Sequence, residues 1–365
     1  MAGSTFGTEF KITTWGESHG KALGVVVDGC PSGLELNEAD IQAFLDRRRP
    51  GRSKYATARS ESDEVTILSG VFEGLTTGTP ISLIVYNKDQ HSSDYSDIAS
   101  YYRPGHADYT FDEKYGFRDY RGGGRSSGRE TIGRVAAGAI AVKILNSLNI
   151  EFLCYTSSIG DISIDHDRFD ASQIDSNPLY MPDASAADKA ALYLDDLKAS
   201  GNSTGGSVEC RISGMPSGIG EPVFDKIDAE LAKAVMSIGA VKAVEIGDGI
   251  SSSLLTGTEN NDFFEMKNGC VTKMTNHSGG TLGGISDGSD ILLRAYFKPT
   301  PSVSASQNTV NKSGENISVN IKGRHDPVIV PRAVVVVESM AAVTIVDLLM
   351  RNLSSRMDNL KKIYL

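Results

Sequence analysis

The alternation of apolar and polar positions along the chain predicts a fold built from both strands and helices. Two β-branched runs, LGVVVDG at residues 23–29 and TPISLIVYN at 79–87, are bounded by Gly, Pro and Asn and are typical of strands. Between them, an apolar face with helical spacing follows Asn37, which can cap a helix, and ends before Pro50, which stops one. We therefore expect a helix that carries the basic residues 47–49 at its carboxyl end, where cations suit the helix dipole.

Three further segments show helical patterns. Apolar spacing predicts a long helix at about residues 130–148 and a shorter one near 186–197. A third helix is expected to follow Asp225 as its cap and to end at Gly239. The run AVKAVEIGDG, which comes next, is typical of a strand.

Two segments lack clear periodicity. Residues 101–129 contain seven Tyr and Phe residues, so we expect a long functional loop there rather than disorder. Residues 160–205 are acidic and rich in Ser, Asp and Ala, which predicts a peripheral insertion. Because no linker divides the chain cleanly, we predict one domain over residues 1–365.

The chain also contains two series of short segments that resemble each other. GTPISLIVYN, then RPGHAD, then a long helix resembles GSDILLRAYF, then KGRHDP, then a second long Ala/Val-rich helix. In each half a strand precedes a basic loop with His and Asp, and a helix follows. This order predicts an α/β fold with a possible internal duplication, in which two related layers form one domain.

Composition limits the function classes. The 40% of hydrophobic residues and 22% of charged residues are ordinary for a soluble protein. A net charge of −10 argues against a general nucleic-acid or membrane-surface binder, since both need broad positive surface. The basic residues instead gather between Arg47 and Arg59 with no acid among them, which favours a site for a small polyanion.

Cysteine usage and the amino terminus add two expectations. The four cysteines lie far apart without a C-x-x-C pair, so we expect buried free thiols, and neither a disulfide framework nor a metal site. The first residues show neither a basic region nor an apolar core of a signal peptide, and no membrane span is evident. A cytoplasmic location is expected.

The motif GESHG, residues 16–20, fits the G-x-S-x-G pattern of a serine nucleophile elbow. Such an elbow needs a helix after the Ser, whereas KALGVVVDG reads as a strand. A phosphate loop of the P-loop type fails too, because too few residues separate the glycines. A Ser18 hydrolase therefore stays the weaker alternative, and His19 becomes the residue of interest.

GGGRSSGR, residues 122–129, combines bare backbone N–H groups, two hydroxyls and two arginines at the start of a predicted helix. This combination favours an anion site over a flexible linker, because glycine-rich turns and helix amino termini point donors at anions. A polyanion-binding module without enzymatic activity is the other alternative that these basic segments allow.

Two more Gly-rich turns carry groups suited to proton transfer. RPGHAD places His106 after a Pro-Gly turn, with Asp108 close enough to orient the imidazole, and GRHDP places Asp326 among cations. The loop FKPTPS offers a rigid backbone, and HSGGTLGGISDG offers glycines against which a planar cofactor could lie. We expect GESHG, RPGHAD and GRHDP to share one cleft.

Taken in order, these motifs closely resemble the chorismate synthase family. The resemblance extends from residue 7 to about residue 350 and is weakest over 160–205. It rests on these strings: TTWGESHG, VDGCPSGL, DRRRPG, ILSGVFEG, RPGHADYT, DYRGGGRSSGRET, GEPVFD, AVKAVEIGDG, GGTLGGIS, KPTPS and GRHDP.

The resemblance implies an activity and a fold. The family carries out the anti 1,4-elimination of phosphate and the C6 hydrogen from 5-enolpyruvylshikimate 3-phosphate, which yields chorismate for aromatic amino acid biosynthesis. It implies reduced FMN as cofactor, with NADPH as the flavin reductant in some members, and a homotetramer. The fold implied is a β-α-β sandwich with helices between two largely antiparallel sheets.

The resemblance also implies roles for individual residues. His19 would protonate the departing phosphate with the help of Ser18, His106 would face the flavin ring, and Asp326 would assist removal of the C6 hydrogen. Ser127 is a further catalytic candidate. Residues expected to bind the flavin are Arg125, Ser126, Ser127, Gly239, Ala240, Gly283, Lys298, Pro299, Thr300, Pro301, Ser302 and Arg324. Residues expected to bind the anionic substrate are Arg48, Arg49, Arg52, Lys54, Arg129 and Arg134.

Overall fold

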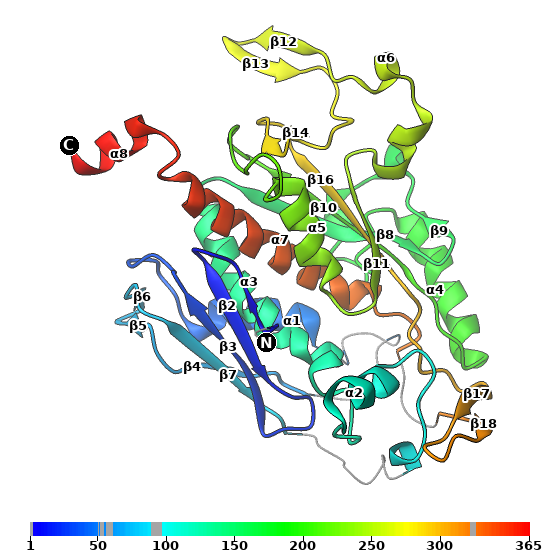
Figure 1. The fold of residues 1–365 in the computed structure, drawn as a ribbon. Helices are drawn as coiled ribbons and strands as arrows, with labels where there is room; N and C mark the ends of the chain where they lie inside the picture. Colours follow the sequence, from blue (N-terminus) through cyan, green and yellow to red (C-terminus); the bar gives the residue numbers. More distant parts are fainter. Residues whose placement is uncertain (1–2, 50, 52–54, 56–60, 89–96, 322–325) are drawn as a thin grey trace.

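Two antiparallel sheets enclose a layer of helices in the computed structural model (Figure 1), as the resemblance implies. The structure describes the chain except for residues 1–2, 50, 52–54, 56–60, 89–96 and 322–325. Since one face of each sheet packs on this helical layer, the expected α/β sandwich is confirmed.

The first sheet has the strand order β1-β2-β3-β7-β4, and every pairing in it is antiparallel. β3 and β7 contain the two β-branched runs, so both predicted strands are confirmed. Alternate residues of β2 are buried, as expected of a sheet with one face on the core. The strands are β1 (Thr5–Phe6), β2 (Lys11–Gly16), β3 (Ala22–Asp28), β4 (Val65–Ile67) and β7 (Ile81–Tyr86).

The second sheet has the order β11-β16-β10-β8-β9 and is also antiparallel throughout. β16 alternates strictly between buried and half-buried residues, so one face meets the helices and the other lies outward. The strand predicted from AVKAVEIGDG is confirmed as β11. The strands are β8 (Glu151–Ile159), β9 (Ile162–Ser163), β10 (Gly206–Ser213), β11 (Val241–Ile246) and β16 (Ile291–Phe297).

The helical layer consists of α1 (Glu38–Arg48), α3 (Thr131–Asn146), α5 (Ile227–Met236) and α7 (Val330–Asn352). Asn37 caps α1 with a complete capping box, as predicted. α3 and α7 cross closely at Gly138, because glycine has no side chain to keep the helices apart. A Cβ at this position would lie 2.2 Å from the Ser339 Cβ. Small residues thus allow α3 and α7 to touch.

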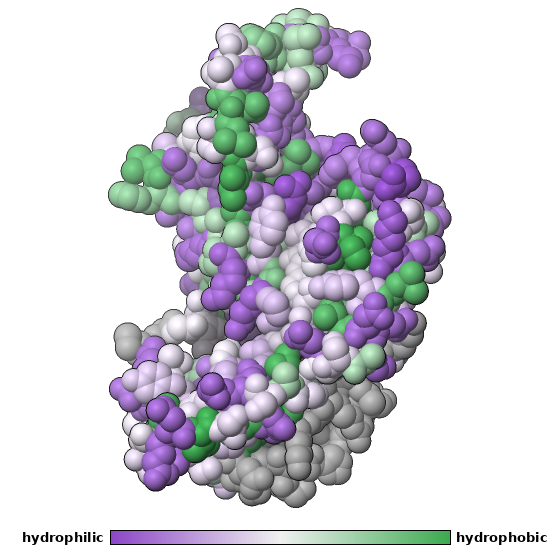
Figure 2. Space-filling model, turned by 90° about the vertical axis from the view of Figure 1, so that its right-hand side faces the viewer, coloured by the Kyte–Doolittle hydropathy of each residue, from purple (hydrophilic) through white to green (hydrophobic). Residues whose placement is uncertain are grey.

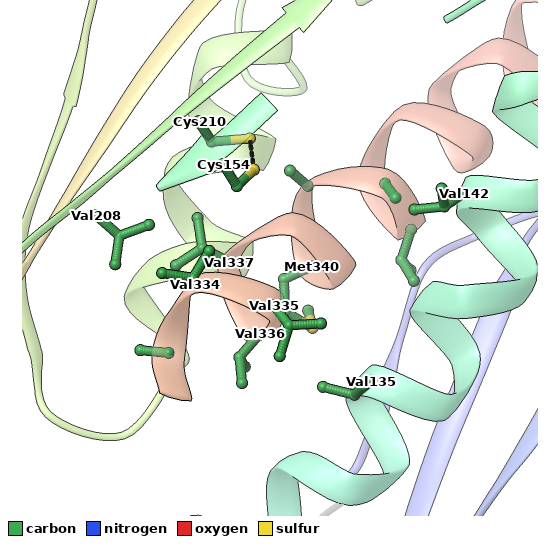
Figure 3. Close-up of a cluster of buried hydrophobic side chains, with 14 of the residues drawn as sticks. Val135, Val142, Cys154, Val208, Cys210, Val334, Val335, Val336, Val337 and Met340 are labelled. Atoms are coloured by element: carbon green, nitrogen blue, oxygen red, sulfur yellow. Dashed lines mark hydrogen bonds between the residues drawn. The ribbon is translucent and has the colours of Figure 1, made fainter. Parts of the chain in front are cut away.

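α7 is a long and strongly apolar helix. By length and composition it could cross a membrane, but 89% of its most apolar window is buried inside the protein. Figure 3 shows the reason, since Val334 and Val337 face Val208 and the cysteines of the second sheet while Met340 faces α3. A helix that is apolar on all sides is expected between two layers of a soluble core.

The order of elements repeats along the chain. With the short elements α2 and α6 left out, the first half reads β3-α1-β4, then one hairpin, then β7-α3. The second reads β10-α5-β11, then the additional hairpin β12–β13 and a hairpin that corresponds to that of the first half, then β16-α7. In each sheet the strand after the hairpin lies between the two earlier strands. This shared topology agrees with the predicted duplication. The hairpins are β5 (Val71–Phe72) with β6 (Leu75–Thr76), and β14 (Thr281–Leu282) with β15 (Ile285–Ser286).

Residues 160–205 lie beside the edge of the second sheet, where β9 pairs with β8 and α4 (Ala184–Ala199) packs on β9 (Figure 1). α4 extends the predicted helix at both ends, with Asp183 as its cap. Ile164, Leu179 and Met181 of this segment join the main core. Whether the segment is an insertion stays a prediction.

Three local predictions were wrong. Residues 101–129 contain α2 (Asp108–Tyr115), a helix of eight residues. The sequence does not predict its start, because Ala107, which precedes the helix, has no side chain that can cap it. α5 begins after Lys226 rather than on an Asp225 cap, since the Asp225 carboxylate pairs with Arg351 at 2.6 Å. Cys270 is exposed, whereas the other three cysteines are buried as expected.

Several short elements complete the described chain. The 3-10 helices are Asp97–Ala99, Gly124–Ser126, Gly128–Glu130, His166–Arg168, Ala171–Gln173 and Gly249–Leu254. The remaining helices are α6 (Gly257–Asn260) and α8 (Met357–Tyr364). The remaining hairpins are β12 (Phe264–Lys267) with β13 (Cys270–Lys273), and β17 (Gln307–Val310) with β18 (Asn316–Val319).

The contact between α3 and α7 leads to a stability prediction. Gly138→Ala should lower the free energy of unfolding by about 1–3 kcal/mol, because the new methyl group forces the helices apart. Urea unfolding followed by circular dichroism measures the change. Gly257→Ala in α6 is the control, since its added methyl group would meet open space. Equal stability of the two variants would contradict the close contact.

Candidate functional site

The GESHG motif forms the turn of a hairpin. β2 ends at Gly16, which has a φ of +85°, and β3 begins at Ala22, so a strand follows Ser18 and the nucleophile-elbow geometry is not met. Ser18 is buried, and its Oγ lies 3.0 Å from Nδ1 of His19. The His19 ring lies against Gly122, where a Cβ would come within 2.1 Å of Nδ1. The hairpin turn therefore meets the 122–129 loop.

The 122–129 segment is ordered as two 3-10 turns that lead into α3, which argues against a flexible linker. Ser127 accepts a bond from the Arg129 N–H at 3.3 Å, and Ser126 donates to the Gly123 carbonyl at 2.7 Å. The Arg125 guanidinium donates to backbone carbonyls of Thr14 and Gly16, each at 3.1 Å. Arg125 thus ties the loop to β2.

Arg48 lies at the end of α1 and is almost completely buried, with 1% of its surface exposed. It forms an ion pair with the buried carboxylate of Asp63 and lies 3.4 Å from the Gly128 carbonyl. Burial lowers the pKa of Arg48 to about 10, although Asp63 offsets part of that effect. Arg48 therefore stays charged at neutral pH and holds Asp63 and the 122–129 segment in place.

Asp63 also binds Arg129, whose Nη1 lies 3.1 Å from Asp63 Oδ1. Arg129 Nη2 lies 2.8 Å from Glu61 Oε2, and its Nε and Nη2 donate to Oδ1 of Asn87 at 3.1 and 2.8 Å, so among the described residues one Nη1–H is left without an acceptor. Arg129 is therefore held on several sides by acceptors from separate segments. Such contacts fix a guanidinium in one orientation, which suits a residue that receives an anion.

The other arginines expected to bind substrate are dispersed. Arg134 pairs with Glu130 at 2.8 Å and donates to Ser237 Oγ at 2.6 Å, so it links α3 to the end of α5. Arg49 forms an exposed pair with Asp46 at 3.3 Å. Arg52 and Lys54 lie outside the described residues. The structure therefore brings Arg48 and Arg129 together at one carboxylate but leaves Arg49 and Arg134 on separate contacts.

His106 is a neutral imidazole at physiological pH. Its Nδ1 lies 3.0 Å from the Pro104 carbonyl, which only accepts, so Nδ1 carries the proton and Nε2 accepts from Ser302 Oγ at 2.9 Å. Burial lowers the pKa of His106, and the nearby Arg103 cation lowers it further. Asp108 does not orient the ring as predicted, because its carboxylate binds Arg103 at 2.8 Å in two places.

The KPTPS loop packs on the turn that carries His106. Lys298 Nζ donates to the Gly105 carbonyl at 3.0 Å, and a Cβ at Gly105 would lie 2.7 Å from that of Pro301. The Lys298 N–H donates to the carbonyl of Ala240, which has a left-handed φ of +74°. These contacts bring two predicted cofactor segments, the KPTPS loop and Ala240, together with the turn that carries His106.

Asp326 is buried and receives a bond from Arg332 Nη1 at 2.7 Å. Arg332 lies in the first turn of α7, and its Nε donates to the Arg48 carbonyl at 3.0 Å. Asp326 and Ser302 also line one pocket of about 120 Å³. Arg324 lies outside the described residues. The Asp326 loop is thus linked to both the Arg48 cluster and His106.

A continuous set of contacts therefore joins the three predicted loops. It runs from His19 to the 122–129 loop, through Arg48 and Arg332 to Asp326, and across the pocket to Ser302 and His106. Sequence reasoning missed Asp63, Asn87 and Arg332, whose roles depend on contacts between distant segments. Among the described residues, no group of three His, Cys, Asp or Glu side chains forms a candidate metal site.

The arrangement offers cations, a neutral imidazole and a second histidine around glycine-rich turns.

Comparison with known proteins narrows the range of reactions that this site could carry out. A family model described as chorismate synthase matches residues 10–350. The chain is 67% identical to the chorismate synthase of Agathobacter rectalis, covering 100% of this chain and 99% of that protein. It is 66% identical to that of Lachnospira eligens, covering 100% of both. A solved structure described as chorismate synthase matches with a TM-score of 0.78 at 31% identity, covering 98% of this chain and 96% of that one.

The Arg48–Asp63 pair leads to a second stability prediction. Asp63→Asn should lower the free energy of unfolding by about 3 kcal/mol or more, because it leaves the Arg48 charge buried without a counter-charge. Asn tolerates the positive φ of +44° at this position, so the backbone stays as it is. Urea unfolding measures the loss.

The matched control is Asp46→Asn, which breaks the exposed pair with Arg49. That change should cost less than about 1 kcal/mol, because water screens exposed charges. Equal free energies of unfolding for the two variants would mean that the buried pair stabilises the fold no more than the exposed pair does.

Proposed function

The chain belongs to the chorismate synthase family, and we propose how its described residues carry out the family's reaction. It is a carbon–oxygen lyase that eliminates phosphate and the C6 hydrogen from 5-enolpyruvylshikimate 3-phosphate to form chorismate. The observation that carries this function is 67% identity along the whole chain to a chorismate synthase.

The residues around the KPTPS loop fit a flavin phosphate and ring. The Thr300 hydroxyl is buried and makes no hydrogen bond within the described residues, and Lys298 of the same loop supplies a cation. A Cβ at Gly239 or Gly283 would meet open space, so both leave backbone accessible to a flat ring. We assign reduced FMN to these segments, with Arg125, Ser126 and Ser127 toward its phosphate. When bound, the reduced flavin supplies electron density that stabilises the developing allylic centre.

The substrate's phosphate and two carboxylates need fixed cations. Arg129 is assigned to bind them directly, because Asn87, Glu61 and Asp63 fix its direction. Arg48 is a positioning residue, since its guanidinium is enclosed and acts through Asp63 and the Gly128 carbonyl. Direct contacts from Arg49, Arg52, Lys54 and Arg134 stay predictions.

His19 is assigned as the acid for the departing phosphate. In its imidazolium form, His19 donates its Nδ1–H to Ser18 Oγ across their 3.0 Å contact, and its Nε2–H can pass a proton to a phosphate oxygen, which leaves a neutral ring. Protonation makes phosphate a better leaving group when the C3–O bond breaks. Ser18 thus orients the ring by accepting its Nδ1–H, which gives it a role without any acyl-enzyme.

His106 and Asp326 are assigned to the other side of the reaction. His106 is neutral, with its proton on Nδ1 donated to the Pro104 carbonyl, so it can accept at Nε2 from a donor next to Ser302. The Asp326 carboxylate, held by Arg332, takes part in removing the C6 hydrogen. Ser127 is assigned a supporting role, since its hydroxyl fixes the turn before α3.

Assembly and supply of the reduced flavin are further proposals. A homotetramer is favoured by the β12–β13 hairpin, which projects from the body and exposes apolar side chains (Figures 1 and 2). An isolated two-stranded hairpin is only marginally stable, so a partner copy would stabilise it. NADPH as the flavin reductant and a cytoplasmic location stay predictions from the sequence.

The two histidines lead to an activity prediction. His19→Ala and His106→Ala should each keep the fold and lose turnover by about 10²–10⁴-fold, as expected for groups that move protons. An anaerobic assay with chemically reduced FMN that follows chorismate absorbance measures the loss. Ser18→Ala should lose less than His19→Ala, because it removes only the contact that orients the ring. Near-full turnover of either histidine variant would remove that residue from the proposed mechanism. Stoichiometric labelling of Ser18 by a fluorophosphonate would instead support the alternative of a serine hydrolase.

The projecting hairpin leads to a prediction about assembly. Phe264→Glu with Met266→Glu, two exposed positions of β12, should reduce the assembly from four chains to fewer, because charges oppose burial against another copy. Light scattering coupled to size-exclusion chromatography measures the mass. Leu192→Glu on exposed α4 is the control and should leave the mass unchanged. A wild-type monomer, or an unchanged mass in the double variant, would count against the hairpin interface.

A further inference from the structure

Asn87 holds the turn that carries His19. It follows β7 directly, and its Nδ2 donates to the Glu17 carbonyl at 3.1 Å and to the Gly20 carbonyl at 2.7 Å. One of these carbonyls precedes His19 in the chain and the other follows it. The Asn87 N–H also donates to the Lys21 carbonyl at 3.1 Å. One residue therefore holds the GESHG turn at three points.

The same amide binds Arg129 at its other end. Asn87 Oδ1 accepts from Arg129 Nε at 3.1 Å and from Arg129 Nη2 at 2.8 Å. A side-chain amide has two N–H donors and two acceptor lone pairs, so all four are used here. Because carbonyls only accept and a guanidinium only donates, the amide nitrogen must face the turn and the amide oxygen must face Arg129. Asn87 thus has one orientation and joins the two segments through a single planar group.

The turn needs this support because it lies beyond the sheet. The pairing of β2 with β3 ends at Gly16, and residues 17–21 lie outside it. The Gly20 N–H closes the turn by donating to the Glu17 carbonyl at 3.1 Å, but this bond does not set the direction of the turn relative to the rest of the protein. β7 pairs with β3 up to the residue before Asn87, so the sheet itself brings the amide to the turn.

Arg129 is the second group whose position Asn87 affects. Its side chain is 10% exposed, and its other described acceptors are Glu61 and Asp63. One Nη1–H has no acceptor among the described residues, which leaves it available to an anion. In the proposed mechanism Arg129 binds the anionic substrate while His19 protonates its departing phosphate. Both groups act on one molecule, and a misplacement of about 1 Å can lower a rate by about 100-fold.

We propose that Asn87 is a positioning residue for the elimination, which sets the place of the His19 turn relative to the Arg129 guanidinium. This inference rests on the roles of His19 and Arg129 in the proposed function. The amide of Asn87 acts through these two groups, so its removal should affect both the proton transfer and the binding of the substrate.

The first test is a double-mutant cycle with Asn87→Ala, His19→Ala and their combination. In the anaerobic assay with chemically reduced FMN, Asn87→Ala alone should lower kcat by about 10- to 100-fold. Beside His19→Ala it should lower kcat by less than about 3-fold, because the group that Asn87 positions is already gone. A residue that only stabilises the fold would lower kcat by the same factor in both backgrounds.

The KM of the substrate reports on the link to Arg129. Asn87→Ala should raise KM by about 3- to 10-fold, since Arg129 loses two of the hydrogen bonds that fix its guanidinium. Beside Arg129→Ala, the same change should raise KM by less than about 2-fold.

Asn87→Asp tests the turn without leaving a cavity, and it carries the test if Asn87→Ala fails to fold. The new carboxylate keeps one oxygen toward Arg129 but places the other against the Glu17 and Gly20 carbonyls, which cannot donate to it. The value of kcat should therefore fall by about 10-fold or more, although the side chain keeps its size.

Asn177→Ala is the matched control. The Asn177 Nδ2 donates to the Gln173 and Met181 carbonyls at 2.6 and 2.9 Å, and its Oδ1 accepts from the Leu179 and Met181 N–H groups at 3.1 and 3.3 Å. This amide is used as fully as that of Asn87, but none of these contacts reaches the loops of the candidate site. Asn177→Ala should lower the melting temperature by an amount similar to that of Asn87→Ala and match the wild type in kcat and KM.

The outcomes separate this inference from the proposed function. Near-full turnover of His19→Ala would overturn the role of His19, and the inference with it. If His19→Ala is impaired, an Asn87→Ala that matches the wild type, or that loses the same factor in both backgrounds, would overturn the inference alone. An unchanged KM in Asn87→Ala, or an equal loss of kcat in Asn177→Ala, would also contradict it.

Discussion

The ion pair between Arg48 and Asp63 is the interaction on which the site depends. Both side chains are buried, so neither can exchange its partner for water, and each must keep the other. Asp63 extends this constraint to Arg129, and Arg48 extends it to the Gly128 carbonyl ahead of α3. The Arg48 carbonyl also accepts a bond from Arg332, which in turn donates to the Asp326 carboxylate. One buried charge pair therefore fixes the relative positions of the 122–129 and 326–327 segments.

The sandwich makes this convergence possible. The carboxyl end of α1 meets the turn before α3 and the first turn of α7, so cations at the end of one helix lie beside the starts of two others. Gly138 and Ser339 let α3 and α7 approach closely, and the two sheets cover the helical layer from opposite sides. The loops that leave these elements carry hydroxyls, glycines and histidines, and the rigid layers between them hold those groups in place.

Local patterns in the sequence predicted much of this architecture. The β-branched runs at 23–29 and 79–87, the Asn37 cap and the long helix before residue 148 depend on neighbouring residues, and the structure has all of them. α2 was missed because it is one short helix in an aromatic segment without a cap signal. Asp63, Asn87 and Arg332 were missed for a different reason. A carboxylate or amide that orients a distant arginine produces no periodic pattern in the sequence, since its partner lies many residues away.

The most direct measurement of the central claim is a stoichiometry. Wild-type protein is incubated without oxygen with 5-enolpyruvylshikimate 3-phosphate and photoreduced FMN, and chorismate, inorganic phosphate and the flavin spectrum are followed together. The account predicts one chorismate for each phosphate released over many turnovers, while the flavin stays reduced because the elimination has no net redox change. Phosphate release without chorismate, or oxidation of one flavin for each product formed, would contradict it.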